Sequence, residues 1–195
     1  MKCLKIALVL CLAGSAVAGE STQQNVVEGL TLLGSPATAK SMGFTKCEDK
    51  YDHYLCSRTT STIFFGTKPS RVEILINGKD NYLPEQSTSN GPKVSEVSPD
   101  KLSYRGIRMQ YDLEEREKLT TFLLKHDWLK SGSFNNTEYF KSGINASIKI
   151  QKFSVSLLPK EESEVEKNVL SLKNSSEVKK TSEEQSNSFI DSMKE

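Results

Sequence analysis

Hydrophobic and polar residues alternate, or form short apolar runs, in two series of segments along the chain. The first series comprises residues 29–33, 44–47, 54–58, 61–65 and 71–76, and the second comprises residues 106–111, 128–131, 139–142, 145–150 and 154–158. Such segments are typical of strands that bury at least one face of a sheet. Turn residues, among them Gly66–Pro69 and Asn77-Gly78, separate the segments. The pattern therefore predicts a mainly antiparallel sheet.

Two further segments carry helix signals. Ser35 is a good N-cap with Pro36 at the first helical position, and Gly43 is a good helix end. Asp112 followed three residues later by Glu115 is a capping box. The residues that then share one helix face are Leu119, Phe122, Leu123 and His126. Together with the strands, these helices predict the α+β class.

The order of these elements is similar in the two parts of the chain. Tyr54-Leu55 corresponds to Tyr139-Phe140, and Val72–Leu75 corresponds to Val155–Leu158, at a nearly constant offset. We therefore predict two tandem β-α-β-β-β-like modules, residues 19–78 and 101–159, that arose by internal duplication. The alternative is two unrelated halves that share common α+β turn signals. Between them, residues 79–100 are rich in Ser, Pro, Gly and Asn and form a polar linker or a long loop.

The two ends of the chain differ from this pattern. Residues 1–18 have a positive start, an apolar run and Ala16-Val17-Ala18 at the end, which together predict a signal peptide cut after Ala18. A buried N-terminal helix, or a lipid-modified Cys11, is the alternative. Residues 160–195 contain no Gly or Pro and a single aromatic residue, so we predict a disordered or weakly helical tail.

Within this tail, Val165, Val169 and Leu172 share one face of a short amphipathic helix. Such a helix would allow the tail to fold on contact with a partner. No segment after the signal peptide is apolar over the length that a membrane span needs.

Cys47 and Cys56 are the cysteines that remain after removal of the signal peptide. Two cysteines normally form a disulfide outside the cytoplasm. Closure of this short loop is expected to stabilise the fold by about 2.5–3 kcal/mol. The spacing argues against a metal site with His53 as a third ligand, and also against a redox site, which favours Cys-x-x-Cys. We therefore predict a structural disulfide and neither metal nor cofactor.

The loop closed by this disulfide carries the candidate contact residues Tyr51, His53 and Tyr54. Aromatic side chains on a pinned loop suit an interface with a partner. The alternatives are a solvated His53 and a Tyr54 packed in the sheet.

The chemistry of the chain points to binding more than to catalysis. The formal net charge is +1 and stays near zero without Lys2 and Lys5, so no overall charge favours nucleic acid. Arg105 and Arg108 are expected on opposite faces of a strand, with Arg108 in ordinary sheet-surface pairing. Motifs of nucleophilic, metalloprotease and nucleotide-binding sites are missing from the sequence.

We therefore expect an exported, periplasmic or secreted, non-enzymatic protein that binds a protein or an envelope polymer. One alternative is a carboxylate-based hydrolase of cell-wall polymer or glycan, which requires Asp and Glu of both halves in one cleft. The other alternative is a secreted factor directed at a host.

Overall fold

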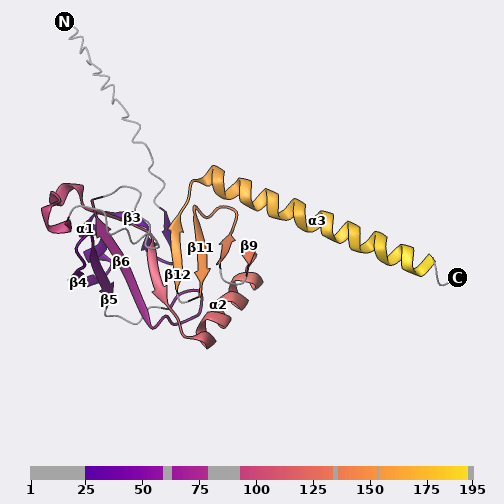
Figure 1. Ribbon diagram of the computed structural model, residues 1–195, viewed down its shortest axis with the longest axis horizontal. Coiled ribbons are helices and arrows are strands. Elements are labelled where there is room, and N and C mark those ends of the chain that lie inside the picture. Colours follow the sequence, from indigo (N-terminus) through magenta and orange to yellow (C-terminus); the bar gives the residue numbers. More distant parts are fainter. Residues whose placement is uncertain (1–24, 59–62, 79–92, 134–135, 153, 193–195) are drawn as a thin grey trace, which may run out of the picture.

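The computed structural model describes residues 25–58, 63–78, 93–133, 136–152 and 154–192. These residues form an α+β fold in which most strands belong to one antiparallel sheet (Figure 1). The strands are β1 (Val26–Val27), β2 (Leu30–Thr31), β3 (Leu33–Gly34), β4 (Phe44–Asp49), β5 (Tyr54–Arg58), β6 (Arg71–Asn77), β7 (Ser103–Arg105), β8 (Ile107–Gln110), β9 (Leu129–Ser133), β10 (Asn136–Phe140), β11 (Ala146–Gln151) and β12 (Val155–Pro159). The helices are α1 (Pro36–Ser41), α2 (Leu113–Lys125) and α3 (Glu162–Ser192), with short 3-10 helices η1 (Val94–Glu96) and η2 (Pro99–Lys101).

One sheet joins the two parts of the chain. Its strand order is β3-β7-β6-β8-β12-β11-β10-β9, and β5 pairs with the other edge of β6 and with β4. β7 and β8 follow one another along β6, pairing with opposite ends of that strand. Gly106 separates them with φ +84°, a conformation that favours glycine. The bend at Gly106 therefore directs β7 toward β3 and β8 toward β12.

The core lies on one face of this sheet. Alternate residues of β6, Val72, Ile74 and Ile76, face it, and so do Leu119 and Leu123 of α2. Ala39 of α1 belongs to the same cluster. Helices from both halves of the chain therefore contribute to one shared core, which is the main reason that the strands hold together as a single sheet.

The two N-cap residues are confirmed, whereas the predicted capping box is only half formed. Ser35 Oγ accepts a hydrogen bond from Thr38 N at 3.4 Å at the start of α1. Asp112 Oδ1 accepts one from Glu115 N at 2.9 Å at the start of α2. The Glu115 carboxylate does not complete the box, because its Oε2 accepts from Lys68 N at 2.7 Å. The side chain of Glu115 therefore ties α2 to the turn before β6.

Several strand predictions need correction. The strand expected at residues 29–33 is divided by a bend at Leu32 into β2, which pairs with β1, and β3, which pairs with β7. The positive φ angles of Glu28 and Gly29 form the turn between β1 and β2. In the strand expected at 61–65, residues 61–62 lie outside the described residues, and Phe64 forms only an isolated bridge with Thr67. Phe64 is instead fully buried in the core. η1 and η2 were not predicted, since the polar composition of residues 79–100 hid them. The short strand β7, which follows that segment, was also not predicted. Residues 79–92 lie outside the described part.

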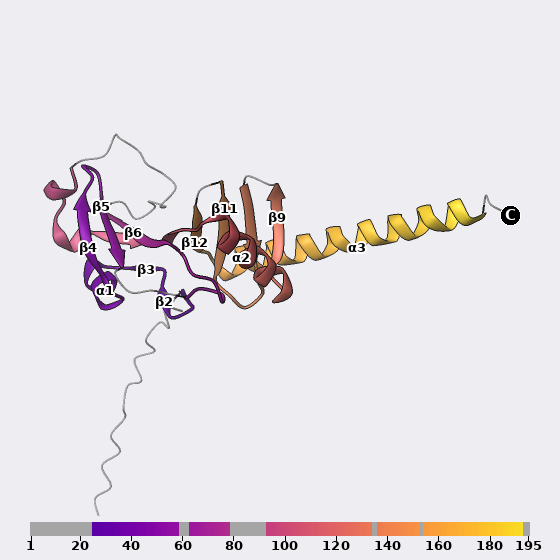
Figure 2. The ribbon, with the colours of Figure 1, turned by 90° about the horizontal axis from the view of Figure 1, so that it is seen from below.

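The C-terminal segment is helical, which is one of the two predicted alternatives. α3 begins beside the sheet (Figures 1 and 2). Val165 and Val169 of its first turns are buried in a cluster with Phe140 of β10. These are the residues whose spacing predicted an amphipathic helix. Beyond them α3 projects away from the sheet (Figure 2). None of the helices among the described residues, α3 included, has the length and apolarity to span a membrane.

Candidate functional site

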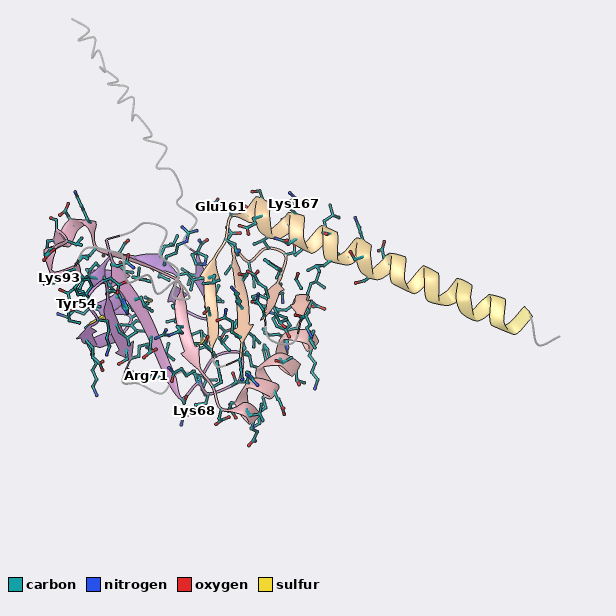
Figure 3. All side chains as sticks on the ribbon, viewed as in Figure 1. Tyr54, Lys68, Arg71, Lys93, Glu161 and Lys167 are labelled. Carbon is teal, nitrogen blue, oxygen red and sulfur yellow. A yellow bond between two sulfur atoms is a disulfide. The ribbon has the colours of Figure 1, made fainter. Side chains whose placement is uncertain are left out.

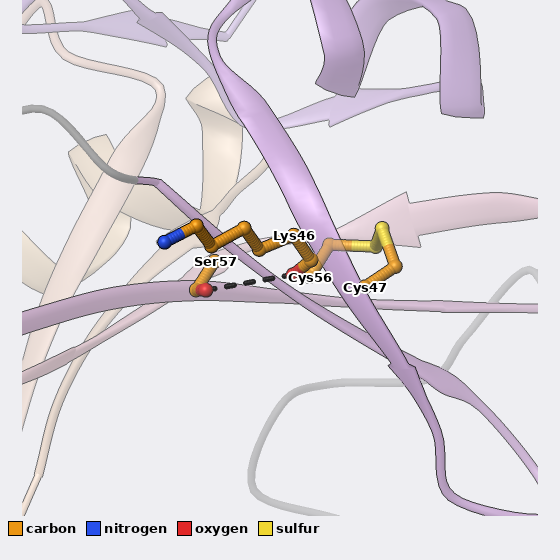
Figure 4. Close-up of a disulfide and its surroundings, with 4 residues drawn as sticks. All are labelled: Lys46, Cys47, Cys56 and Ser57. Carbon is orange, nitrogen blue, oxygen red and sulfur yellow. Dashed lines mark hydrogen bonds between the residues drawn. A yellow bond between two sulfur atoms is a disulfide. The ribbon is translucent and has the colours of Figure 1, made fainter.

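The hairpin of β4 and β5 carries the predicted disulfide, and the structure confirms it (Figure 4). Cys47 and Cys56 lie opposite each other in register, with an S–S distance of 2.04 Å and a Cα–Cα distance of 4.0 Å. This short separation is typical of a non-hydrogen-bonded antiparallel pair, so the backbone N–H and C=O of Cys47 point away from β5. Cys56 is fully buried in the core. The disulfide therefore fastens the outer strand β4 to the body of the sheet.

A tight turn connects β4 to β5. Lys50 N donates to His53 O at 2.9 Å, and Asp52 N donates to Lys50 O at 3.0 Å. Tyr51, at the centre of the turn, has a φ of +73°. This angle belongs to the left-handed region, which is unfavourable for a residue with a bulky side chain. The turn thus places backbone strain on a tyrosine where glycine would have none.

Three contacts hold Tyr51 in this conformation. Its N–H donates to Asp49 Oδ1 at 2.9 Å, and its carbonyl accepts from Val94 N at 2.6 Å. The Lys93 ammonium lies 5.8 Å from the centre of its ring, within the range of a cation–π interaction. Even so, Tyr51 is 55% exposed. The surface made by Tyr51 and Lys93 is called the hairpin tip below.

The other two predicted contact residues are less exposed. His53 Nδ1 lies 2.8 Å from Asp52 Oδ1, and the His53 side chain is only 12% exposed. Tyr54 is half-buried and packs against the core; Figure 3 shows it at the same end of the molecule as Lys93. The structure therefore brings Tyr51, His53 and Tyr54 together on one hairpin but displays mainly Tyr51. Both sulfur atoms are in the disulfide, and the described residues contain no cluster of three or more potential metal ligands.

The outer strand β4 adds a second element to the hairpin tip. Among the described strands it pairs only with β5, and its residues from Thr45 to Asp49 are all exposed. Lys50 Nζ lies 2.7 Å from Glu48 Oε2, and this hydrogen bond lowers the pKa of Glu48. The hairpin tip is therefore continuous with a charged, open sheet edge.

A buried carboxylate, Glu73, is a residue that sequence reasoning missed. Its side chain is 1% exposed and forms ion pairs with Arg108 at 2.8 Å and with Arg71 at 2.5 Å. Glu73 and Arg108 face each other in the β6–β8 register. The predicted sheet pairing of Arg108 is thus observed, but with a buried partner. No sequence signal indicated that β6 and β8 are neighbours. This cluster links the two halves of the sheet.

The cavities bear on the hydrolase alternative. Three of the cavities formed by described residues each take their carboxylates from one half of the chain: Glu117 in the first, Glu114 and Glu117 in the second, and Glu28 in the third. The convergence of carboxylates that this alternative requires is not found among these described cavities.

His126 ends α2, as expected, and stacks on Phe122 with 3.8 Å between ring centres.

Comparison of the chain with protein-family models, with curated proteins and with solved structures finds no match. The function is therefore argued from the geometry of the chain alone.

Proposed function

We propose that this chain is an exported, non-enzymatic binding protein that contacts a macromolecular partner through the hairpin tip. The observation that carries the proposal is Tyr51: a strained backbone, three local contacts and a disulfide all serve to display one aromatic ring. Strained residues persist where the surrounding structure holds them, and they cluster at binding and catalytic sites. Tyrosine is also among the residues that dominate binding energy at interfaces.

The open edge of β4 favours a protein as the partner over an envelope polymer. The backbone groups of Cys47 point outward, and an extended peptide could pair with them as an added strand. The mixed charges of Lys46, Glu48 and Asp49 along this edge suit a partner strand with both signs of charge. Tyr51 and Lys93 at the end of the strand would then fix its register.

Export remains part of the proposal. The predicted signal peptide, residues 1–18, and its cleavage after Ala18 lie outside the described residues. The Cys47–Cys56 disulfide supports an oxidising location. A periplasmic protein and a secreted protein would differ only in their location after export. The alternative of a factor directed at a host applies to the secreted protein.

We also propose that the two halves derive from one duplicated module. The order β3-α1-β4-β5-β6 and the order β8-α2-β9-β10-β11-β12 both place a helix after a strand and before antiparallel strands. Helices α1 and α2 both pack into the shared core. These similarities support the predicted modules at 19–78 and 101–159.

Site-specific photo-crosslinking tests the proposed binding surface. A photoreactive phenylalanine analogue replaces Tyr51 in one variant and Leu124, an exposed residue of α2, in the control. The variants are expressed in the organism that encodes the protein. We expect one discrete adduct from position 51 and none from position 124. The proposal is wrong if position 51 yields no adduct beyond the level at position 124.

A further inference from the structure

A cavity of about 650 Å³ lies between α2 and the sheet, far from the hairpin tip in the fold. Its floor includes Tyr139 of β10 and Ile150 of β11, and its roof includes Leu113 and Arg116 of α2. This volume is in the range of sites for small organic molecules. Neither the disulfide hairpin nor the proposed partner contact uses this cavity.

Three cationic residues line the cavity: Arg116, Lys130 and Lys152. Arg116 and Lys130 come from opposite sides. Arg116 comes from α2, and its Nη1 donates to Lys152 O at 2.5 Å, which fixes the guanidinium at the rim. Lys130 comes from β9, opposite Tyr139 in the strand register. A carbonyl contact leaves the charge of Arg116 without a counter-charge. The one carboxylate in the lining is Glu117, and no ion pair joins Glu117 or Lys130 to another described residue. The cavity is therefore positively charged.

The remaining lining is apolar or offers oxygen atoms. Leu113 and Ile150 supply apolar surface. Thr137 Oγ1 donates to Ser133 O at 2.8 Å and Thr120 Oγ1 donates to Arg116 O at 3.1 Å. Both hydroxyl protons are used by backbone carbonyls, and Thr120 also shares a side-chain hydrogen bond with Tyr139. These hydroxyl groups are therefore engaged within the protein, and the cationic side chains are the groups that can bind an anion. The apolar floor and the cationic rim together match a ligand with an apolar body and one anionic end.

We propose that this cavity binds a small amphipathic organic anion, with its carboxylate or phosphate between Arg116 and Lys130 and its apolar part against Leu113 and Ile150. Charge-assisted hydrogen bonds from Arg to such groups are short and strong. Lys130 supplies the second charge from the opposite wall and is exposed in the free protein. The proposal is independent of the proposed function, because no residue of the hairpin tip lines the cavity.

Isothermal titration calorimetry of the chain from residue 19 to residue 195 tests this site. The probes are octanoate, octyl phosphate, inorganic phosphate and neutral octyl glucoside, each below its micelle concentration. We expect saturable binding of octanoate or octyl phosphate at one site, and binding of the glucoside that is weaker by about tenfold or more. The comparison of octanoate with octyl phosphate shows whether the site prefers a carboxylate or a phosphate as the anionic group of its ligand.

The variant Lys130→Gln is expected to weaken binding of the anionic probe by about tenfold. Lys40→Gln on α1, an exposed lysine outside the cavity, is the matched control and is expected to bind like the parent protein. Equal binding of the glucoside, no saturable binding of either octyl anion, or unchanged binding by Lys130→Gln overturns the proposal. If inorganic phosphate binds as tightly as octyl phosphate, the proposed contact between the apolar part of the ligand and the cavity is wrong.

Discussion

The backbone conformation of Tyr51 lowers the stability of the fold, and it keeps the aromatic ring exposed at the surface. Its φ of +73° costs about 1 kcal/mol or more for a residue with a Cβ atom, and the ring recovers little burial because it stays 55% exposed. Asp49 of β4 and Val94 at the start of η1 hold the residue in place. Sequence reasoning selected Tyr51 as a contact residue from its place on a pinned loop, but it had no means to foresee the backbone conformation. Lys93 and Val94 were missed because no local signal links residues this far apart.

Replacement of Tyr51 by glycine tests the strain. Tyr51→Gly is expected to raise the free energy of unfolding by about 0.5–1 kcal/mol relative to Tyr51→Ala, because glycine adopts positive φ without penalty. Urea unfolding of both variants, with the parent protein, measures this difference. Equal stability of the two variants would show that the backbone of Tyr51 carries no strain. Both variants should lose the partner contact.

At the level of elements, local signals predicted the helices better than the strands. The caps Ser35 and Asp112 satisfy backbone N–H groups of their own helices, so the information lies within a few residues. The strands at 54–58 and 71–76 agree with β5 and β6 to within one residue. The pairing partners of β6 depend on residues far along the chain, and therefore no local pattern indicated them. For the same reason the burial of Glu73 could not be predicted, because it follows from the pairing of β6 with β8.

The β4–β5 hairpin is expected to depend on its disulfide. Replacement of both Cys47 and Cys56 by alanine should lower the free energy of unfolding by about 2.5–3 kcal/mol in the chain-entropy model. The midpoint of urea unfolding, compared with the oxidised parent protein, checks this value. The double variant should also give a weaker crosslink from position 51, since only backbone pairing then holds the outer strand to β5. An unchanged midpoint would contradict a stabilising role.

The attachment of α3 is expected to weaken at low pH. Ser142 Oγ donates to Glu166 Oε1 at 2.8 Å and Gly143 N donates to it at 3.0 Å, and these hydrogen bonds lower the pKa of Glu166. The folded pKa is therefore below the unfolded value of about 4.3. The contribution is fully present above that value and is lost as the pH falls through the folded pKa.

The NMR shift of the Gly143 amide, followed between pH 6 and acid conditions, measures this change. Glu166→Gln is the control and should abolish the titration of that amide while Val165 and Val169 stay packed. A Gly143 amide that shifts equally in the parent protein and in Glu166→Gln would contradict the assignment.

For the whole molecule, the single sheet couples the stability of the two halves of the chain. The sequence predicted two modules joined by a linker or a long loop, and these modules could share one sheet or pack side by side. In the structure β6 and β8 pair directly, and both halves supply residues to one core. The α+β class could be predicted because the alternation of apolar residues and the helix caps depend on residues that are close in sequence. Whether two modules share a sheet depends on an edge-to-edge contact that leaves no local trace. The duplication itself remains a proposal for the same reason.

A shared sheet and core should make unfolding cooperative. We expect one transition in urea, with the same midpoint for the amides of β5 and of β11 in hydrogen exchange and for the fluorescence of Trp128. Independent modules would instead give separate midpoints for β5 and β11. Arg108→Gln, which removes an ion-pair partner of Glu73, is expected to lower both midpoints together.

The reach of α3 has a practical consequence for any measurement on this protein. Its 31 residues extend about 46 Å at the usual helical rise, from a sheet end opposite the one that carries Lys93 and Tyr54 (Figures 1 and 3). An affinity tag or a surface tether attached beyond Ser192, the last residue of α3, would follow the end of the helix that is distant from the sheet. Immobilisation through the C-terminus therefore leaves Tyr51 facing free solution, whereas labels on the lysines near the tip would cover it.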